Sequence, residues 1–429
     1  MVRFNKGAWL LATSAAMILA PGAAHATDGY FLNGISIVDK GHAGAGVANP
    51  ETPLTIGVNP AGIAEIDPQV DVGITMFTPR RQFTGSGGPG FTPTGTVKST
   101  SNYFFLPSAG ATWKIGDNTA VGVAVFGNGG MNTHYDNVTN PACASPPLPS
   151  SNGVYCGGNA GVNLIQAFVS AGVARKLGDH LTVGVAPVFG MQIFHAQGLA
   201  AFSGLSVDPT KMTNNGNSTS TGFGVRLGAL LKLTPDIKLG FSWQSKMKMS
   251  RFKEYSGLFA DGGKFDIPSS FTVGLSMRPV PMVTFMADYR HIEYQGVASV
   301  ARSSLTPAPF GSAGGPGFGW TNVDEYKFGL SVTPTEKLTL RAGMSFNNNP
   351  VQSQDATLNI LAPGVSKEHF TGGVGYKTSE RSAVNFAFVY SPDATTTGIE
   401  ITPAGPNPGH AIELKMHQFE VGLGWSHKF

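Results

Sequence analysis

Hydrophobic and polar residues alternate along most of this chain with a period of two. In residues 222–233, Phe223, Val225 and Leu227 share one face, while glycines and charged residues occupy most of the other. The same alternation returns in three further stretches, residues 239–249, 338–346 and 383–390. One such stretch is typical of a half-buried strand in a soluble sheet, whereas a long series with no helical period between its members predicts a β-barrel.

Short polar breaks separate these stretches in pairs and predict tight turns. They fall at residues 116–118, 178–180, 234–236, 278–279, 334–336 and 379–381. Longer segments rich in Gly, Pro, Ser and Asn fall at roughly residues 131–160, 198–220, 297–318 and 393–410. Short turns on one side and long loops on the other are typical of bacterial outer-membrane barrels, which have an even number of strands. Counting runs from Val70 onward gives about fourteen strands, so we expect an all-β, transmembrane antiparallel β-barrel.

The C-terminus ends on an aromatic alternation that reaches the last residue. Phe419, Val421, Leu423, Trp425, His427 and Phe429 occupy every second position. This pattern resembles the C-terminal signal by which outer-membrane proteins are recognised for insertion. On the opposite parity, Ile412, Leu414 and Met416 would point into the outer part of the lumen, unless a β-bulge near Met416 reverses the faces.

The N-terminus predicts export. Arg3 and Lys6 precede an apolar stretch, and Ala24-His25-Ala26 has the small-x-small form of a cleavage site. We therefore expect residues 1–26 to be a signal peptide. A retained anchor is the alternative, but the apolar stretch is too short for a transmembrane helix.

Composition narrows the class of protein further. Charged residues make up 13% of the chain, glycine occurs 57 times, mean hydropathy is +0.01, and the net charge is +3. A soluble protein usually has about twice that share of charged residues, and beyond the signal no run reaches the length of a transmembrane helix. The charge does not favour nucleic acid as a partner. No motif suggests catalysis, a metal or a cofactor, so we expect a protein that is not an enzyme.

Residues 27–66, which precede the first strand run, form a different kind of segment. They are rich in glycine and alanine and contain Asn59-Pro60-Ala61-Gly62. A flexible leader is one interpretation. The segment also carries many apolar residues, among them Tyr30, Phe31 and Leu32, which a solvated leader does not need. We therefore predict a hatch that plugs the lumen, followed by a barrel domain over residues 67–429.

Several motifs resemble one known family. Thr27-Asp28-Gly29-Tyr30-Phe31 and Asn59-Pro60-Ala61-Gly62, with the stretches 267–271 and 341–351, are similar to the long-chain fatty acid transporter (FadL) family, which includes hydrocarbon-uptake relatives. The resemblance covers essentially the whole chain after the signal. It implies a fourteen-stranded barrel, an N-terminal hatch, sideways exit of the substrate through the wall, and a monomer.

In that family the wall opens at an inward kink in the third strand. Here the third run, residues 121–126, leads into Gly127, Asn128, Gly129 and Gly130. Glycines weaken a strand and permit a bend with unmade ladder bonds. The alternative is a strand that ends and runs into its loop. The position in the third strand favours the kink.

A fatty acid needs a cation or hydrogen-bond donors for its carboxylate. Alternation places four cations on the lumen face, Arg226, Lys246, Arg290 and Arg341, together with the acids Asp71, Asp288, Glu325 and Glu420. Because buried charges are generally paired, we expect most of these to pair with one another and hold the hatch. One or two of the four cations would then contact the substrate.

Cys143 and Cys156 lie in the first long external loop. Two cysteines in one loop of an exported protein predict a disulfide. A metal or redox pair is the alternative, but no His or further Cys lies at ligand spacing.

Three functions fit this sequence. The first is passive transport of long-chain fatty acids or similar lipids. The second is uptake of aromatic or other hydrocarbons, and the third is a general porin or adhesion barrel, against which the hatch argues. We expect a hydrophobic small molecule as substrate, outer-membrane lipid and lipopolysaccharide as surroundings, and the outer membrane of a Gram-negative bacterium as the location.

Overall fold

The computed structural model describes residues 29–144 and 152–429, so the expected signal peptide lies outside the described residues. Its sixteen strands are β1 Gln69–Gly87, β2 Gly95–Lys98, β3 Phe104–Ile115, β4 Thr119–Tyr135, β5 Ala160–Leu177, β6 Leu181–Gln197, β7 Ser218–Thr234, β8 Ile237–Gln244, β9 Lys248–Met249, β10 Ser270–Val280, β11 Val283–Ile292, β12 Val323–Val332, β13 Leu338–Asn347, β14 Glu368–Lys377, β15 Ser382–Thr402 and β16 Gly405–Lys428.

The helices are short. Three helices of residues 29–144 and 152–429 are α-helical, α1 Ile37–Gly41, α2 Ala260–Gly263 and α3 Ala298–Ala301. Nine elements in the same residues are 3₁₀ turns, η1 Pro53–Gly57, η2 Pro60–Ala64, η3 Pro141–Ala144, η4 Ala200–Leu205, η5 Pro209–Lys211, η6 Lys253–Tyr255, η7 Tyr294–Gly296, η8 Ser353–Asp355 and η9 Leu358–Ile360. Among the described residues, no helix is long and apolar enough to cross a membrane.

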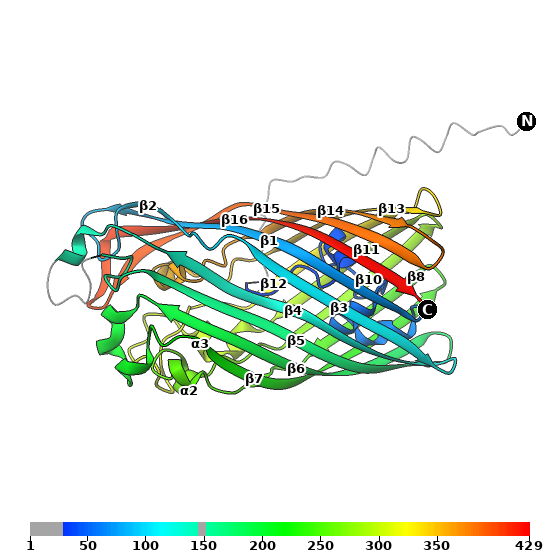
Figure 1. Cartoon of the computed structure of the whole chain (residues 1–429), viewed down its shortest axis with the longest axis horizontal. Helices are drawn as coiled ribbons and strands as arrows, with labels where there is room; N and C mark the ends of the chain where they lie inside the picture. The colour runs from blue at the N-terminus through cyan, green and yellow to red at the C-terminus, as the bar shows by residue number, and fades with distance from the viewer. Residues whose placement is uncertain (1–28, 145–151) are drawn as a thin grey trace, which may run out of the picture.

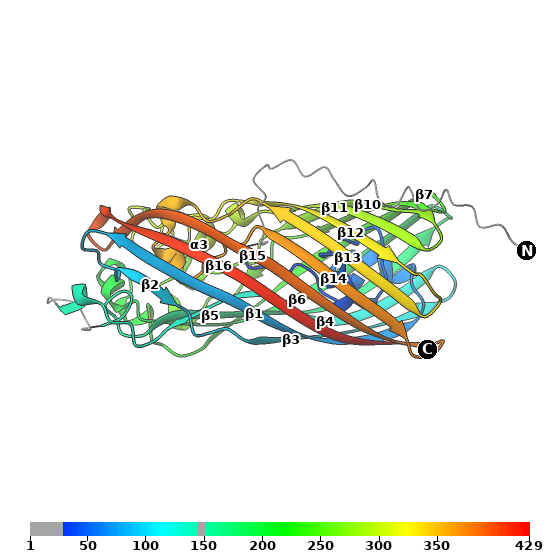
Figure 2. The ribbon, with the colours of Figure 1, turned by 90° about the horizontal axis from the view of Figure 1, so that it is seen from above.

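The strands form one closed antiparallel barrel. Each barrel strand pairs with its neighbours in sequence, and β16 returns to pair with β1 from Gln69↔Lys428 to Gly87↔His410. β2 pairs only with β1 and β9 only with β7, so these two are side strands and fourteen strands make the wall. Long, tilted strands run the length of the molecule (Figure 1 and Figure 2). The predicted fourteen-stranded barrel is confirmed.

Alternation decides which side chains face outward. On β16, the odd-numbered residues from Phe419 to Trp425 are exposed on the outer wall, whereas Gln418 and Glu420 are buried inside. Ile412, Leu414 and Met416 are buried as well. β16 pairs with β1 without a register shift, so no bulge reverses the faces and the outer part of the lumen is apolar, as the sequence predicts.

One predicted loop is wrong. Residues 393–410 belong mostly to β15 and β16, which continue as a paired hairpin as far as Thr402↔Gly405. Threonine and isoleucine residues between Thr395 and Ile401 favour extended backbone, and two strands of one hairpin satisfy each other's hydrogen bonds. The loop between β13 and β14, which the composition does not mark, instead folds inward and buries Ile360 and Leu361.

Residues 29–66 fill part of the lumen (Figure 1 and Figure 2). Ser36 begins α1 with a capping box, in which its hydroxyl accepts from the backbone N–H of Asp39 and the Asp39 carboxylate accepts from the backbone N–H of Ser36. Asn59 caps η2 by accepting from the backbone N–H of Ala61, and Pro60 starts the turn. These local signals give an otherwise irregular segment a defined shape.

Candidate functional site

The Asn59-Pro60-Ala61-Gly62 motif packs directly on the barrel wall. The Asn59 amide donates to the carbonyl oxygens of Val47 at 2.8 Å and of Ala229 at 3.1 Å. Glycines on the facing strands permit this contact, because a Cβ on Gly184 would lie 2.4 Å from the backbone nitrogen of Ala61 and a Cβ on Gly228 would lie 2.0 Å from Oδ1 of Asn59. The motif therefore fixes the position of the hatch on β6 and β7.

Buried acids of the barrel hold the hatch elsewhere. Lys40 of α1 makes an ion pair with Glu420 of β16, and both side chains are almost fully buried. Oδ2 of Asp288 on β11 accepts from the backbone N–H groups of Gly46 at 2.8 Å and Val47 at 2.9 Å. Glu420 and Asp288, two of the predicted lumen acids, therefore bind the hatch itself.

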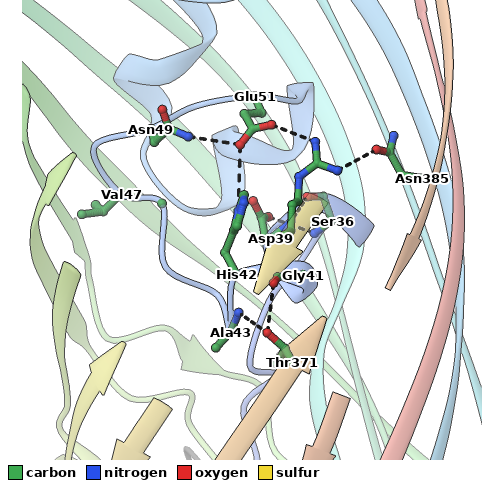
Figure 3. Close-up of polar contacts among 12 residues, drawn as sticks. Ser36, Asp39, Gly41, His42, Ala43, Val47, Asn49, Glu51, Thr371 and Asn385 are labelled. Carbon is green, nitrogen blue, oxygen red and sulfur yellow. Dashed lines mark hydrogen bonds and ion pairs between the residues drawn. The ribbon is translucent and has the colours of Figure 1, made fainter. Parts of the chain in front are cut away.

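Arg341 of β13 also binds the hatch. Its guanidinium donates to Oε2 of Glu51 at 3.0 Å and to Oδ1 of Asn385 at 3.2 Å (Figure 3). His42 lies beside the same carboxylate, with Nδ1 at 3.9 Å from Oε1 of Glu51. Burial lowers the pKa of His42 to about 4, an effect that Glu51 opposes and Arg341 reinforces. Thr371 ties the end of α1 to β14 by bonding the backbone of Gly41 and Ala43 (Figure 3).

β4 does not end at its glycines. It runs from Thr119 to Tyr135, straight through the segment Gly127–Gly130, so the alternative of a strand end is wrong. Its register with β5 shifts between Gly127↔Ala167 and Gly129↔Gln166, which leaves Asn128 as an extra residue. This is a β-bulge, which bends a strand locally. It lies in the third strand of the wall.

The pairing between β3 and β4 is interrupted next to this bulge. β3 and β4 pair from Ile115↔Thr119 only as far as Ser108↔Phe126. Beyond that pair, Phe104 and its neighbours bond only to β1, and residues from Gly127 onward bond to β5. The segment before β3 and the end of β4 are joined again where the backbone N–H of Thr100 donates to the carbonyl of His134 at 2.8 Å. We call the gap between residues 101–107 and 127–133 the window.

The start of the hatch binds the free edge of β4 inside the window. The backbone N–H of Leu32 donates to the carbonyl of Asn128 at 3.2 Å, and the N–H of Gly130 donates to the carbonyl of Tyr30 at 3.1 Å. Phe31 and Gly129 form the resulting antiparallel bridge. The hatch thus replaces β3 as the partner of β4 at this point.

Two cavities meet at this hatch segment. A cavity of about 340 Å³ lies behind the window and is lined mainly by apolar residues, among them Tyr30, Phe31, Phe77, Phe104, Leu106, Met131, Leu164 and Trp320. A smaller, polar cavity of about 60 Å³ lies on the other side of Leu32, which lines both. The smaller cavity contains Arg226, Arg290, Lys327, Asp39 and Asp288.

The four predicted cations have different surroundings. Arg341 is bound to Glu51 of the hatch. Arg290 lies 4.0 Å from Glu325 and over the ring of Phe31. Arg226 is buried and donates to Gln244, and its Nη1 has no partner among the described residues. Only Arg226 and Arg290 line a cavity near the window.

The placement of Lys246 in the lumen is wrong. This residue follows β8, is exposed, and makes an ion pair with Asp266 at 3.2 Å. Arg226 pairs with Gln244, whereas Gly222 pairs with Met249. The segment from Gln244 to Met249 is therefore one residue longer than the segment of β7 that it faces. A one-residue bulge reverses the faces of every residue beyond it, and strict alternation therefore fails here.

Arg81 is a further cation at the site that the sequence analysis did not name. It lies on β1, is 6% exposed, and lines the apolar cavity. It shares its parity with Asp71, which was placed in the lumen, so alternation along β1 was a sufficient signal to include it.

Cys143 and Cys156 form the predicted disulfide in the external loop after β4. The sulfurs are therefore not available to a metal. Within residues 29–144 and 152–429, no group of three or more His, Cys, Asp or Glu side chains is placed to hold a metal ion.

A closed barrel with an apolar outer wall, a hatch in its lumen and an apolar cavity behind a window defines a class of protein, the outer-membrane transport channels. Residues 18–400 match the family described as outer membrane protein transport protein (OMPP1/FadL/TodX). The chain belongs to this family, and it is an outer-membrane channel for hydrophobic compounds.

Individual relatives are distant. An outer-membrane protein of Neisseria meningitidis serogroup B is 21% identical, and the match covers 96% of each chain. Among solved structures, a Pseudomonas aeruginosa FadL homologue has a TM-score of 0.69 at 15% identity and covers 94% of this chain and 100% of its own. The Pseudomonas putida toluene transporter TodX has a TM-score of 0.66 at 17% identity and covers 93% and 99%. At these identities the structural likeness supports the fold alone.

Proposed function

We propose that this channel passes long-chain fatty acids or similar hydrophobic acids inward by passive diffusion, and that they leave sideways into the membrane through the window at Gly127–Gly130. The observation that carries the proposal is the position of the apolar cavity directly behind the window. Rim residues of both strands, such as Leu106 and Met131, line this cavity. An apolar molecule can then enter lipid without crossing water, where its exposure would be unfavourable.

The hatch supports sideways rather than axial exit. Tyr30, Phe31 and Leu32 form the inner wall of the apolar cavity, and the polar cavity on their other side is small and contains charges of both signs. An apolar chain would lose favourable surroundings by moving into that charged space. In this proposal Arg226 and Arg290 remain candidates for a carboxylate that reaches past the hatch segment.

Uptake of aromatic hydrocarbons is the second candidate. Tyr30, Phe31 and Trp320 supply several ring faces and edges to the cavity, which suits a small aromatic ligand. TodX, one of the structures of similar fold, is a toluene transporter. A general porin is disfavoured, because the hatch is packed in the lumen.

The test is uptake of labelled oleate by cells that lack their own fatty-acid importer. A Cβ on Gly127 would have no neighbour closer than 3.9 Å, and the atoms at that distance or just beyond include Leu32 on the hatch side and Leu106 on the rim. Gly127→Trp should therefore place an indole in the window, and Gly127→Ala is the matched control.

We expect wild type and Gly127→Ala to take up oleate, and Gly127→Trp to lose at least nine-tenths of that uptake at equal surface expression. Undiminished uptake by Gly127→Trp would contradict the sideways exit. Absence of oleate uptake by the wild type, together with toluene uptake, would favour the hydrocarbon alternative.

A further inference from the structure

Two consecutive arginines of β1 flank the rim of the window. The Cζ of Arg81 lies 5.6 Å from the centre of the Phe104 ring, and the Cζ of Arg80 lies 5.1 Å from the centre of the Tyr103 ring. Successive residues of a strand point to opposite faces. Arg81 accordingly lines the apolar cavity, whereas Arg80 does not and contacts the exposed Tyr103 at the rim of that cavity.

The Arg81 guanidinium is deeply buried without an acidic partner among the described residues. Its Nη2 donates to the carbonyl oxygen of Ser101, and its Nε has no partner. Of the described residues that line the same cavity, Glu420 is the one acid, and it is already paired with Lys40 of the hatch. A neutral carbonyl oxygen and a ring face leave most of the positive charge uncompensated.

Other buried cations of the lumen differ from Arg81 in this respect. Lys40 is paired with Glu420, Lys327 lies 3.0 Å from Glu325, and Arg341 lies 3.0 Å from Glu51. Arg226 also has no acid at ion-pair distance in the part of the chain that the structure describes, but its small cavity contains Asp39 and Asp288. Arg81 is therefore distinguished by an apolar cavity and an uncompensated charge at the same place.

We propose that Arg81 binds the anionic headgroup of the substrate while the tail lies against the aromatic and aliphatic lining of the cavity. The inference rests on the proposed function and narrows the substrate class to single-chain carboxylates over neutral hydrocarbons. A guanidinium presents several N–H donors in a plane and binds a carboxylate with two parallel hydrogen bonds. A cavity of about 340 Å³ is within the usual range for small-molecule sites.

Arg81 also makes the window selective. A headgroup bound at Arg81 positions the attached chain beside Leu106 and Met131, which line the cavity from the two rims of the window. A neutral hydrocarbon would find the same apolar surface but no partner for the guanidinium, which would remain uncompensated.

The experiment measures binding of radiolabelled oleate and of oleyl alcohol, its neutral analogue, to the purified full-length protein in a neutral detergent at pH 8. The variants are Arg81→Gln, Arg81→Lys and, as the matched control, Arg80→Gln, which removes the neighbouring arginine on the other face. Heat-modifiable migration in gels checks that each barrel is folded.

We expect the wild type to bind oleate at least tenfold more tightly than oleyl alcohol. Arg81→Gln should weaken oleate binding at least tenfold and leave oleyl alcohol within about twofold, a difference typical of a lost charged hydrogen-bond partner. Arg81→Lys should fall between, and Arg80→Gln should resemble the wild type.

Equal affinity of the wild type for the two ligands would overturn the proposal without any variant, and so would an equal loss of both ligands in folded Arg81→Gln. These results are separate from the uptake test. If oleate binding depends on Arg81 but Gly127→Trp still takes up oleate, the headgroup site stands and the sideways exit fails. If Gly127→Trp abolishes uptake but Arg81→Gln leaves oleate binding unchanged, the sideways exit stands and the headgroup site fails.

Discussion

Gly127 and Gly129 belong to one short motif but have different surroundings. A Cβ on Gly129 would lie 1.7 Å from the carbonyl oxygen of Tyr30, whereas a Cβ on Gly127 would have no neighbour closer than 3.9 Å. Gly129 is therefore required for the contact between the hatch and the edge of β4. Gly127 instead leaves space open in the window.

We predict that Gly129→Ala displaces the segment from Tyr30 to Leu32. The methyl group cannot share space with the Tyr30 carbonyl, and the two backbone hydrogen bonds that join this segment to Asn128 and Gly130 would be lost. Each such bond contributes about 1 kcal/mol, so the barrel should remain folded. Oleate uptake should fall at least fivefold relative to Gly127→Ala, measured in the same cells at equal surface expression. Equal uptake by the two variants would show that the cavity does not need this inner wall.

Residue-level prediction from the sequence succeeded where alternation was unbroken. Arg226, Arg290 and Arg341 all lie inside, because β7, β11 and β13 keep their parity at these positions. The prediction that Lys246 faces the lumen was wrong because the extra residue between Gln244 and Met249 reverses the faces of the strand. No pattern in the amino-acid sequence marks such a bulge, since the bulge depends on the register of the partner strand.

Elements were predicted well because a barrel strand has to repeat one pattern over its whole length. The number of wall strands and the inward apolar face of β16 follow from that repetition. The prediction of a long loop over residues 393–410 was wrong because the proline, glycine and asparagine residues that suggested it also occur at the tip of a hairpin. The window was only partly predictable. Glycines indicated a bend, but the missing pairing between β3 and β4 is a contact between strands that local sequence does not encode.

The hatch contains a histidine whose protonation should loosen it. The pKa of His42 is about 4 in the packed hatch, mainly because of burial, against 6.5 when it is free. A released hatch therefore binds more protons between pH 6.5 and pH 4. Packing is stable above pH 6.5 and loses stability as the pH falls through that range, by roughly 2 kcal/mol between pH 7.5 and pH 5.

Hydrogen exchange of hatch amides 37–57, corrected for intrinsic rates, measures this effect. Protection in the wild type should fall about thirtyfold more than in His42→Gln on going from pH 7.5 to pH 5, the ratio that corresponds to roughly 2 kcal/mol. Asp39, Glu51 and Arg341 surround His42 and are unchanged in both proteins, so the difference isolates the imidazole. Parallel loss of protection in both proteins would assign the pH response to these carboxylates instead.

For the whole molecule, we expect the hatch to decide whether the barrel conducts ions. Among the described residues, Lys40 and Glu420 form the most deeply buried ion pair between the hatch and the barrel wall. Removing one partner of such a pair leaves an uncompensated charge and costs about 3–5 kcal/mol, whereas replacing both partners by apolar residues is often neutral. The exposed pair of Lys428 with Asp67 at the C-terminal end of the barrel should contribute at most about 1 kcal/mol.

We therefore predict that the wild type is nearly silent in planar bilayers, because the hatch packs against the wall at Gly184 and Gly228 and is held there by the Lys40–Glu420 pair. Lys40→Met should show frequent ion-conducting openings, since Glu420 then favours hydration over burial. Lys40→Met combined with Glu420→Leu should be quiet again, and Lys428→Met should match the wild type. If Lys40→Met were as silent as the wild type, apolar packing and Asp288 would have to hold the hatch without this pair. Steady conductance by the wild type would mean that water passes the hatch, and a porin would then describe the molecule better than a channel with a sideways exit.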